Sequence, residues 1–233
     1  MKEKIFVFGA SGHAKVVIDT IERHGLYDIV FLVDDDPALK GTKFYDYHVI
    51  GGKLELLEVR DQICGGIVAI GSNRARIAVA NWLTDNGFDL VLAIHPFAQL
   101  GRGVTVDIGT VIMAGAIINS DSRIGRNVIV NTRASIDHDC TIGHGVHIAP
   151  GTTLCGTVRI GDGTFVCAGA TIIPNLTIGS NVIVGAGSTV IRDVPDCKLV
   201  VGSPAKVVNN CKGNFDALAI CHSGSDFEPE SSL

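Results

Sequence analysis

An aliphatic side chain recurs at every sixth position through the middle of the chain. The series has seventeen members and no gap: Ile94, Leu100, Val106, Ile112, Ile118, Ile124, Val130, Ile136, Ile142, Ile148, Leu154, Ile160, Val166, Ile172, Ile178, Val184 and Val190. A period of six fits neither the 3.6-residue turn of an amphipathic helix nor the heptad of a coiled coil. It predicts a solenoid, in which short units stack and each buries its apolar face against the next.

The positions between these aliphatic residues predict a corner in every hexad. The third residue after each aliphatic is usually Gly, Asn or Asp, which tolerate the left-handed backbone of a tight corner. These residues are Gly103, Gly109, Gly115, Asp121, Asn127, Asp139, Gly145, Gly151, Gly163, Gly169, Asn175, Asn181, Gly187 and Asp193. Three hexads then close a triangular coil of 18 residues, and about five coils fit into the repeat. Gly125, Gly143, Gly161 and Gly179 recur at this spacing, so each should lie above the last.

The first ninety residues predict a different architecture. Four apolar runs predict strands: Ile5–Phe8, Ile29–Val33, Ile67–Ile70 and Leu90–Ile94. Two segments with helical spacing lie between strands: Ala14–His24 and Arg74–Asn86. Because strands and helices alternate, we expect a small parallel α/β sheet of Rossmann-like type at 1–95. The solenoid would occupy 96–207, and we assign no function to the polar tail at 208–233.

Three polar turns follow strands of the predicted sheet, at the edge where such sheets bind ligands. They are Ser11-Gly12-His13, Asp34-Asp35 and Gly71-Ser72-Asn73. Ser11 stands where a dinucleotide fingerprint needs its second glycine, which disfavours dinucleotide binding. A nucleoside diphosphate at the helix N-terminus is compatible with the turn. The alternatives are that Gly9 and Gly12 only permit the turn, and that the aspartates form a solvated loop before Pro37.

Composition narrows the class of protein. The net charge is -5 and Lys and Arg do not cluster, which argues against a nucleic-acid partner. No apolar run reaches membrane-spanning length and no signal peptide is evident, so we expect a cytoplasmic protein. The seven cysteines are odd in number and scattered, as in a protein with reduced thiols. Cys140 occupies a small, inward position of its hexad, so we do not expect a cysteine nucleophile.

Three histidines lie within ten residues of the repeat. His138 falls two residues after the inward Ile136, so its side chain should point outward near a corner, directly before Asp139. One interpretation is a catalytic base whose imidazole is oriented by a carboxylate. The other is a zinc site built from His138, His144 and His147. For His144 alone we expect simple exposure to solvent.

Motifs from Gly9-Ala-Ser-Gly-His13 through Asn131-Thr132, His138-Asp139-Cys140 and His147 to Gly202-Ser-Pro-Ala-Lys206 resemble the NeuD/PglD-like sugar acetyltransferases. This resemblance covers about residues 3 to 207 and includes perosamine and bacillosamine-pathway N-acetyltransferases. It implies a left-handed parallel β-helix of the hexapeptide-repeat superfamily, assembled as a homotrimer. It also implies that acetyl-CoA binds between adjacent subunits, while the N-terminal domain holds a nucleotide-linked aminosugar.

The resemblance assigns a role to each matched position. His138 would be the general base and Asp139 the carboxylate that raises its basicity, although some relatives have Glu there. His147 would lie beside the acetyl thioester, with Ala168 and Ala186 contacting CoA through their backbones. For the nucleotide sugar, the resemblance implies that Ser11, Gly12 and His13 contact the diphosphate and sugar. It implies that Asp34 and Asp35 hold the base or ribose, and that Gly71 forms part of the wall of the substrate site. Ala14 departs from relatives that have Gly after the histidine.

These features predict an acetyl-CoA-dependent N-acetyltransferase that acts on the amine of a nucleotide-linked deoxyaminosugar and needs no metal. The nearest alternative is O-acetylation of a sialic-acid-type sugar. A zinc hydro-lyase like the γ-class carbonic anhydrases shares the hexapeptide repeat, because a fold does not fix the chemistry it supports. A non-catalytic nucleotide-sugar-binding module would leave the His138-Asp139 pair unexplained. The sequence does not determine which sugar or nucleotide is bound.

Overall fold

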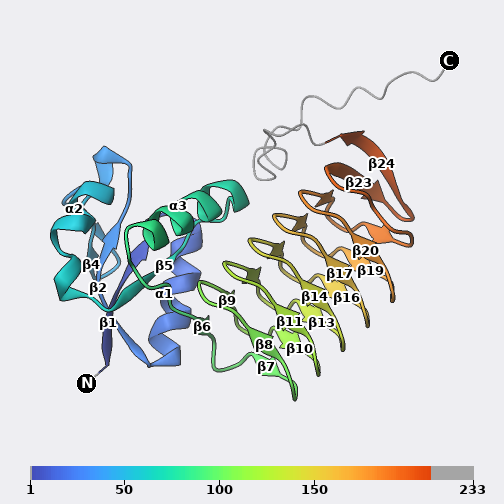
Figure 1. The fold of residues 1–233 in the computed structure, drawn as a ribbon, viewed down its shortest axis with the longest axis horizontal. Coiled ribbons are helices and arrows are strands. Elements are labelled where there is room, and N and C mark those ends of the chain that lie inside the picture. The colour runs from blue at the N-terminus through green and yellow to red at the C-terminus, as the bar shows by residue number, and fades with distance from the viewer. Residues whose placement is uncertain (1, 211–233) are drawn as a thin grey trace.

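The N-terminal part of the chain is a small parallel sheet covered by helices on both faces (Figure 1). The computed structural model describes residues 2–210. Strands β1 (Glu3–Phe8), β2 (Tyr27–Val33) and β5 (Gly65–Val68) pair in the order β2-β1-β5. The side chains of β1 alternate between the two faces: Ile5 and Val7 belong to the apolar cluster that includes helix α1, and Phe6 and Phe8 to the cluster of α2 and α3. A strand buried on both faces reads as a continuous apolar run, as this one does.

Two of the helices confirm the predictions from sequence. They are α1 (Gly12–His24) and α3 (Asn73–Asp85). Helix α1 ends at Gly25, whose φ of 75° is the left-handed conformation that terminates many helices. Helix α3 begins after Ser72, whose hydroxyl accepts a hydrogen bond from the Ala75 N–H.

Several short elements between β2 and β5 have no counterpart in the sequence prediction. They are the 3₁₀ helix Pro37–Leu39, the hairpin of β3 (Lys43–Phe44) and β4 (Tyr47–His48), helix α2 (Lys53–Glu58), and the 3₁₀ helix Arg60–Gln62. Each is too short to show a period of its own. Asp36 caps the first of them by accepting a hydrogen bond from the Ala38 N–H.

The prediction of a fourth strand at Leu90–Ile94 in this sheet was wrong. Leu90 makes a single parallel bridge to Gly66 beside β5. Ala93 and Ile94 form β6 and pair instead with β9 of the solenoid. Ile94 is the first member of the aliphatic series that recurs every six residues, and its side chain packs against the solenoid core.

The solenoid is built from three parallel sheets that run along its length (Figure 1). The domain-facing sheet contains β6 (Ala93–Ile94), β9 (Val111–Ile112), β12 (Ile129–Val130), β15 (His147–Ile148), β18 (Phe165–Val166), β21 (Ile183–Val184), β23 (Lys198–Gly202) and the antiparallel β24 (Ala205–Asn210). The second sheet contains β7 (Gln99–Leu100), β10 (Ile117–Ile118), β13 (Ser135–Ile136), β16 (Thr153–Leu154), β19 (Thr171–Ile172) and β22 (Thr189–Val190). The third sheet contains β8 (Thr105–Val106), β11 (Arg123–Ile124), β14 (Thr141–Ile142), β17 (Arg159–Ile160) and β20 (Thr177–Ile178).

The register of these sheets confirms the predicted coil of 18 residues. Ile118 pairs with Ile136, and Ile124 pairs with Ile142. The predicted stacking of the glycines that recur from Gly125 to Gly179 is also confirmed. A Cβ on Gly125 would lie 2.9 Å from the carbonyl carbon of Gly143. A side chain at such a position would collide with the backbone of the next coil.

The aliphatic series forms the core of the solenoid. Its members from Ile112 to Val190 are buried. The first three are only partly buried, since the first coil has no coil before it. All the predicted corner residues except Asp193 adopt the expected left-handed backbone, with φ of 60° at Asp121, 55° at Asn127 and 59° at Asp139. The prediction for Asp193 was wrong, and Cys197 adopts this conformation near the end of the solenoid instead, with φ of 56°.

The small domain and the solenoid share one apolar cluster, which includes Ile18 of α1 and Val111, Met113 and Ile129 of the domain-facing sheet. No helix within residues 2–210 is long and apolar enough to cross a membrane. Five cysteines in the same range form no disulfide bond, namely Cys64, Cys140, Cys155, Cys167 and Cys197, while Cys211 and Cys221 lie outside it. Most of the predicted tail, from residue 211 on, also lies outside the described residues.

The buried aliphatic column predicts that a Leu→Ala substitution destabilises the protein far more inside the column than on the surface. Leu154 is 1% exposed in the solenoid core, whereas Leu54 is 76% exposed on α2. We expect Leu154→Ala to lower the free energy of unfolding by about 2–5 kcal/mol, because it leaves a cavity. Leu54→Ala should change it by less than about 0.5 kcal/mol. Urea denaturation at one fixed protein concentration measures both, and equal midpoints would contradict the packing described here.

Candidate active site

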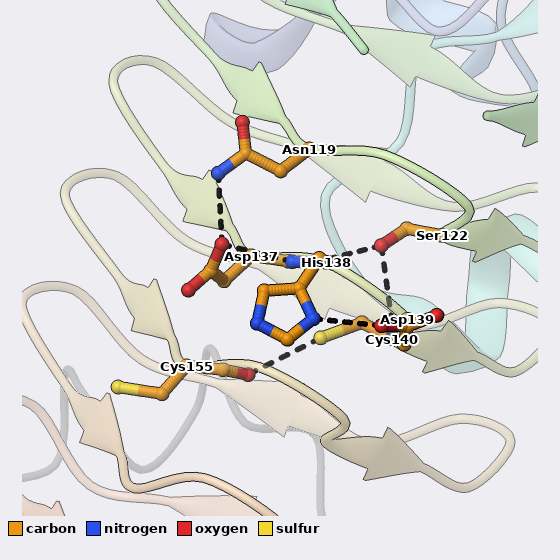
Figure 2. A network of polar contacts seen from close by, with 7 residues as sticks. All are labelled: Asn119, Ser122, Asp137, His138, Asp139, Cys140 and Cys155. Carbon is orange, nitrogen blue, oxygen red and sulfur yellow. Dashed lines mark hydrogen bonds and ion pairs between the residues drawn. The ribbon is translucent and has the colours of Figure 1, made fainter. Parts of the chain in front are cut away.

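The His138-Asp139 pair lies in the corner between β13 and β14, where the second and third sheets meet (Figure 2). Asp139 holds the left-handed conformation of that corner. Its Oδ2 lies 2.7 Å from Nδ1 of His138. The His138 side chain is 55% exposed, so the ring faces outward as the hexad pattern predicted.

The environment of His138 favours a proton on Nδ1 and a free lone pair on Nε2. A neutral imidazole that donates from Nδ1 to a carboxylate keeps Nε2 as its acceptor. The hydrogen bond to Asp139, and next the negative charge of Asp137, raise the pKa of His138 above its ordinary value of 6.5. Asp137 is itself held in place, since its Oδ1 accepts hydrogen bonds from the Asn119 side-chain amide and the His138 N–H, both at 2.9 Å.

A second cluster lies between the small domain and the domain-facing sheet. It brings together His13 of α1, Gly71 after β5, and His147 of β15. The rings of His13 and His147 are 6.2 Å apart between centroids, and His147 is only 5% exposed. Asn131 fixes His147 through a 3.1 Å contact between its side-chain amide and Nε2. Nε2 of His13 and Nδ1 of His147 are both buried without a hydrogen-bond partner among the described residues, and the Gly71 backbone lies close to the His147 ring.

Both histidines of this second cluster are neutral at physiological pH. Burial, followed by the charge of Arg76, lowers the pKa of His13 to about 4. Burial, Arg76 and then His13 lower the pKa of His147 well below 6.5. The pKa shifts of the two clusters therefore have opposite signs: the pKa of His138 is raised, whereas the pKa values of His13 and His147 are lowered.

The turn at the start of α1 is open toward solvent. Ser11 and Gly12 are exposed, and the Ser11 side chain makes no capping hydrogen bond. A Cβ added at Gly12 would meet no protein atom within 4 Å. The backbone amides of this helix N-terminus therefore lie beside free space that an anion could occupy.

The two aspartates after β2 have different partners. The Asp34 carboxylate accepts hydrogen bonds from the Ala10 N–H at 2.8 Å and the Asp36 N–H at 2.9 Å, so it ties the α1 turn to β2. Asp35 forms an ion pair with Lys53, at 2.9 Å from its Nζ. Lys53 was missed from the sequence because it belongs to α2, whose existence no pattern indicated.

Ala168 and Ala186 lie on a third part of the surface, the corner between the domain-facing and second sheets. Both are exposed, one coil apart, and the Ala168 carbonyl accepts a hydrogen bond from the Gly187 N–H at 2.9 Å. Their small side chains leave the backbone of this corner accessible. A ligand running along the solenoid could contact both positions.

One chain thus carries the predicted site residues on separate surfaces. His138 and Asp139 occupy the corner between the second and third sheets, whereas His13, Gly71 and His147 lie against the domain-facing sheet. His144 is exposed in a different corner and accepts a hydrogen bond from the Arg126 N–H. The three histidines of the zinc interpretation therefore do not converge, and residues 2–210 contain no group of three or more His, Cys, Asp or Glu placed to hold a metal ion.

Sequence profiles and solved structures identify the family. The profile of the PglD N-terminal domain matches residues 4–83, and that of the bacterial transferase hexapeptide (six repeats) matches 121–156 and 157–192. A crystal structure of PerB from Caulobacter crescentus in complex with CoA and GDP-perosamine is 42% identical, with a TM-score of 0.83 over 88% of this chain and 97% of that one. The chain belongs to the PglD-like sugar acetyltransferases of the hexapeptide-repeat superfamily.

Other members of the family superimpose equally well. The acetyltransferase domain of PglB from Neisseria gonorrhoeae FA1090, in complex with acetyl coenzyme A, is 36% identical, with a TM-score of 0.82 over 89% of this chain and 100% of that one. WeeI from Acinetobacter baumannii AYE is 27% identical, with a TM-score of 0.79 over 87% of this chain and 98% of that one. The protein is therefore an enzyme, an acyltransferase, rather than a non-catalytic binding module.

The raised pKa of His138 can be measured directly. By histidine-selective NMR titration we expect a pKa above 6.5 for His138. We expect a lower value in Asp139→Asn, which replaces a charged acceptor by a neutral amide oxygen. Asp121→Asn is the matched control, since Asp121 occupies the equivalent corner one coil earlier with the same left-handed backbone. If Asp139→Asn shifts the pKa no more than Asp121→Asn does, Asp139 is not the partner that sets it.

Proposed function

We propose that this enzyme transfers the acetyl group of acetyl-CoA to the amine of a nucleotide-linked deoxyaminosugar, with His138 as the general base. The observation that carries the proposal is the His138-Asp139 pair, which leaves Nε2 of an exposed imidazole free to take a proton. The relatives support the substrates, because PerB binds CoA and GDP-perosamine and the PglB domain binds acetyl coenzyme A.

The chemistry needs one base and no covalent acyl-enzyme. The neutral amine attacks the thioester carbon, and Nε2 of His138 removes a proton from the nitrogen as the C–N bond forms. Asp139 stabilises the resulting imidazolium through Nδ1. When the C–S bond breaks, the proton on Nε2 passes to the CoA sulfur, so the base returns to its starting state. Cys140 is buried and burial raises the pKa of its thiol, which argues against a cysteine nucleophile.

The nucleotide sugar would bind at the C-terminal edge of the small sheet. The amides at the start of α1 face open space beside Gly12, which suits a diphosphate. Asp35 and Lys53 lie at the same edge and offer opposite charges to a ribose or base. His13 and Gly71 would line the sugar end, toward His147 and the solenoid.

We further propose that the active site forms between subunits of a homotrimer. His138 and the turn at Gly12 lie on different surfaces of one chain, so a second copy is needed to bring base and acceptor together. Ala168 and Ala186 would contact CoA along the same intersubunit cleft. Cyclic symmetry then gives three equivalent sites.

Turnover should depend on His138. We expect His138→Ala to lower kcat by about 10²- to 10⁴-fold with little change in acetyl-CoA binding, as for loss of a general base. His144→Ala is the control, an exposed histidine in another corner. Thiol release from acetyl-CoA is followed with UDP-, GDP- and CMP-linked aminosugars and with their hydroxyl counterparts, which separates N- from O-acetylation. Near-normal turnover in His138→Ala would place the base elsewhere.

If the active site is formed by two subunits, two inactive variants should restore activity to each other in mixed trimers. His138→Ala removes the base. Gly12→Trp adds a bulky side chain to the proposed diphosphate turn, at a position where a Cβ would have nothing beyond its own helix and chain neighbours within 4 Å. When equal amounts are refolded together, every mixed trimer has one site with both parts intact. About a quarter of the wild-type rate should return, whereas each variant alone stays inactive. Absence of rescue in trimers verified by mass spectrometry would mean that one chain supplies the whole site.

A further inference from the structure

Arg76 is a cation buried between the two domains. Its side chain is 1% exposed, on the inner face of α3 with Val79, Ala80 and Leu83. Burial lowers the pKa of its guanidinium to about 9, so it still carries its charge at neutral pH. Among residues 2–210, no Asp or Glu forms an ion pair or hydrogen bond with it. A buried charge without a countercharge is costly to maintain, which calls for a compensating role.

The guanidinium is satisfied by neutral acceptors from both domains. Its donors reach the carbonyl oxygens of Ile70 at 3.1 Å, Gly71 at 3.2 Å, Asn127 at 2.9 Å, Gly145 at 2.9 Å and Val146 at 3.4 Å, and the Asn73 Oδ1 at 2.7 Å. Gly71 is the expected wall of the sugar site, and Val146 directly precedes His147. One planar group with five donors therefore fastens the wall of the acceptor site to the segment that carries His147.

We infer that Arg76 is a positioning residue of the acceptor site, which holds Gly71 and the His147 segment in register. Its positive charge adds to the larger effect of burial, which lowers the pKa of His13 and His147. It does not touch substrate itself, because protein encloses it. Its effect would pass through the two imidazoles, whose ring centroids are 6.2 Å apart, and through the position of the Gly71 backbone.

The charges around the two histidines support this role. Two titratable groups lower the pKa of His147 through their charge: Arg76 from α3 and His13 from α1. For His13, the one such group is Arg76. The other ring neighbours of His147, Asn131 and Phe165, are uncharged. Two neutral imidazoles can hydrogen-bond a sugar hydroxyl or an amine without competing for its proton. His138 is then the one histidine of the proposed site whose pKa is raised above its ordinary value.

The inference rests on the proposed function, so its test has one arm that needs no substrate. In histidine-selective NMR of the ligand-free protein, Arg76→Met should raise the pKa of His13 and His147, because it removes the neighbouring positive charge. Arg74→Lys, an exposed position on the same helix, is the control. Unchanged histidine titration in Arg76→Met would overturn the electrostatic part.

The second arm measures the geometry. A lysine cannot span the carbonyl groups that the guanidinium joins, so Arg76→Lys should raise the KM for GDP-perosamine, or for the best nucleotide aminosugar of the screen, by about 10- to 100-fold. In Arg76→Met the profile of kcat/KM against pH should gain a second inflection. If Arg76→Met does not fold, Asn73→Ala, which removes one guanidinium partner, should raise the same KM by a smaller factor. A wild-type KM in Arg76→Lys would overturn the positioning role, whereas inactivity of the unmodified enzyme with every sugar would refute the proposed function alone.

Discussion

The burial of one aliphatic column is the constraint on which the rest of the structure depends. Each coil is closed by short strands, which are too short to be stable alone. They persist because the strands of the inner coils pair in register with those 18 residues before and after them, while the inward side chains pack into a continuous core. A shift of one residue would turn that column outward, so the register is strongly fixed.

This register also decides where the candidate catalytic base lies. The corner between β13 and β14 needs a residue in the left-handed conformation, and Asp139 fills that need. The same backbone that closes the coil thus places a carboxylate beside the imidazole of His138, at a distance of 2.7 Å. Because corners face outward, the pair is exposed on one chain. The pKa of His138 is therefore raised by the neighbouring carboxylates more than it is lowered by burial.

At the junction between the domains, burial rather than neighbouring carboxylates sets the direction of the pKa shifts. There the imidazole of His147 and the guanidinium of Arg76 are buried and the imidazole of His13 is half-buried, and burial lowers the pKa of each. Polar groups of this kind are tolerated because backbone carbonyls of both domains satisfy the guanidinium. The proposed reaction would place the acceptor between this dry junction and the exposed base of another subunit.

The sequence by itself determined the period, the coil length, the corner conformations and the outward placement of His138, since these depend on local spacing and residue type. It also determined α1, α3 and the family. It assigned Leu90–Ile94 to the wrong sheet, because an apolar run does not state which partner it pairs with. It missed α2, whose few residues show no period. Only the tertiary structure decided that Arg76 would be buried and that His13 and His147 would meet. Those contacts join segments far apart along the chain: Arg76 lies 51 residues from Asn127 and 69 from Gly145, and His13 and His147 are farther apart still.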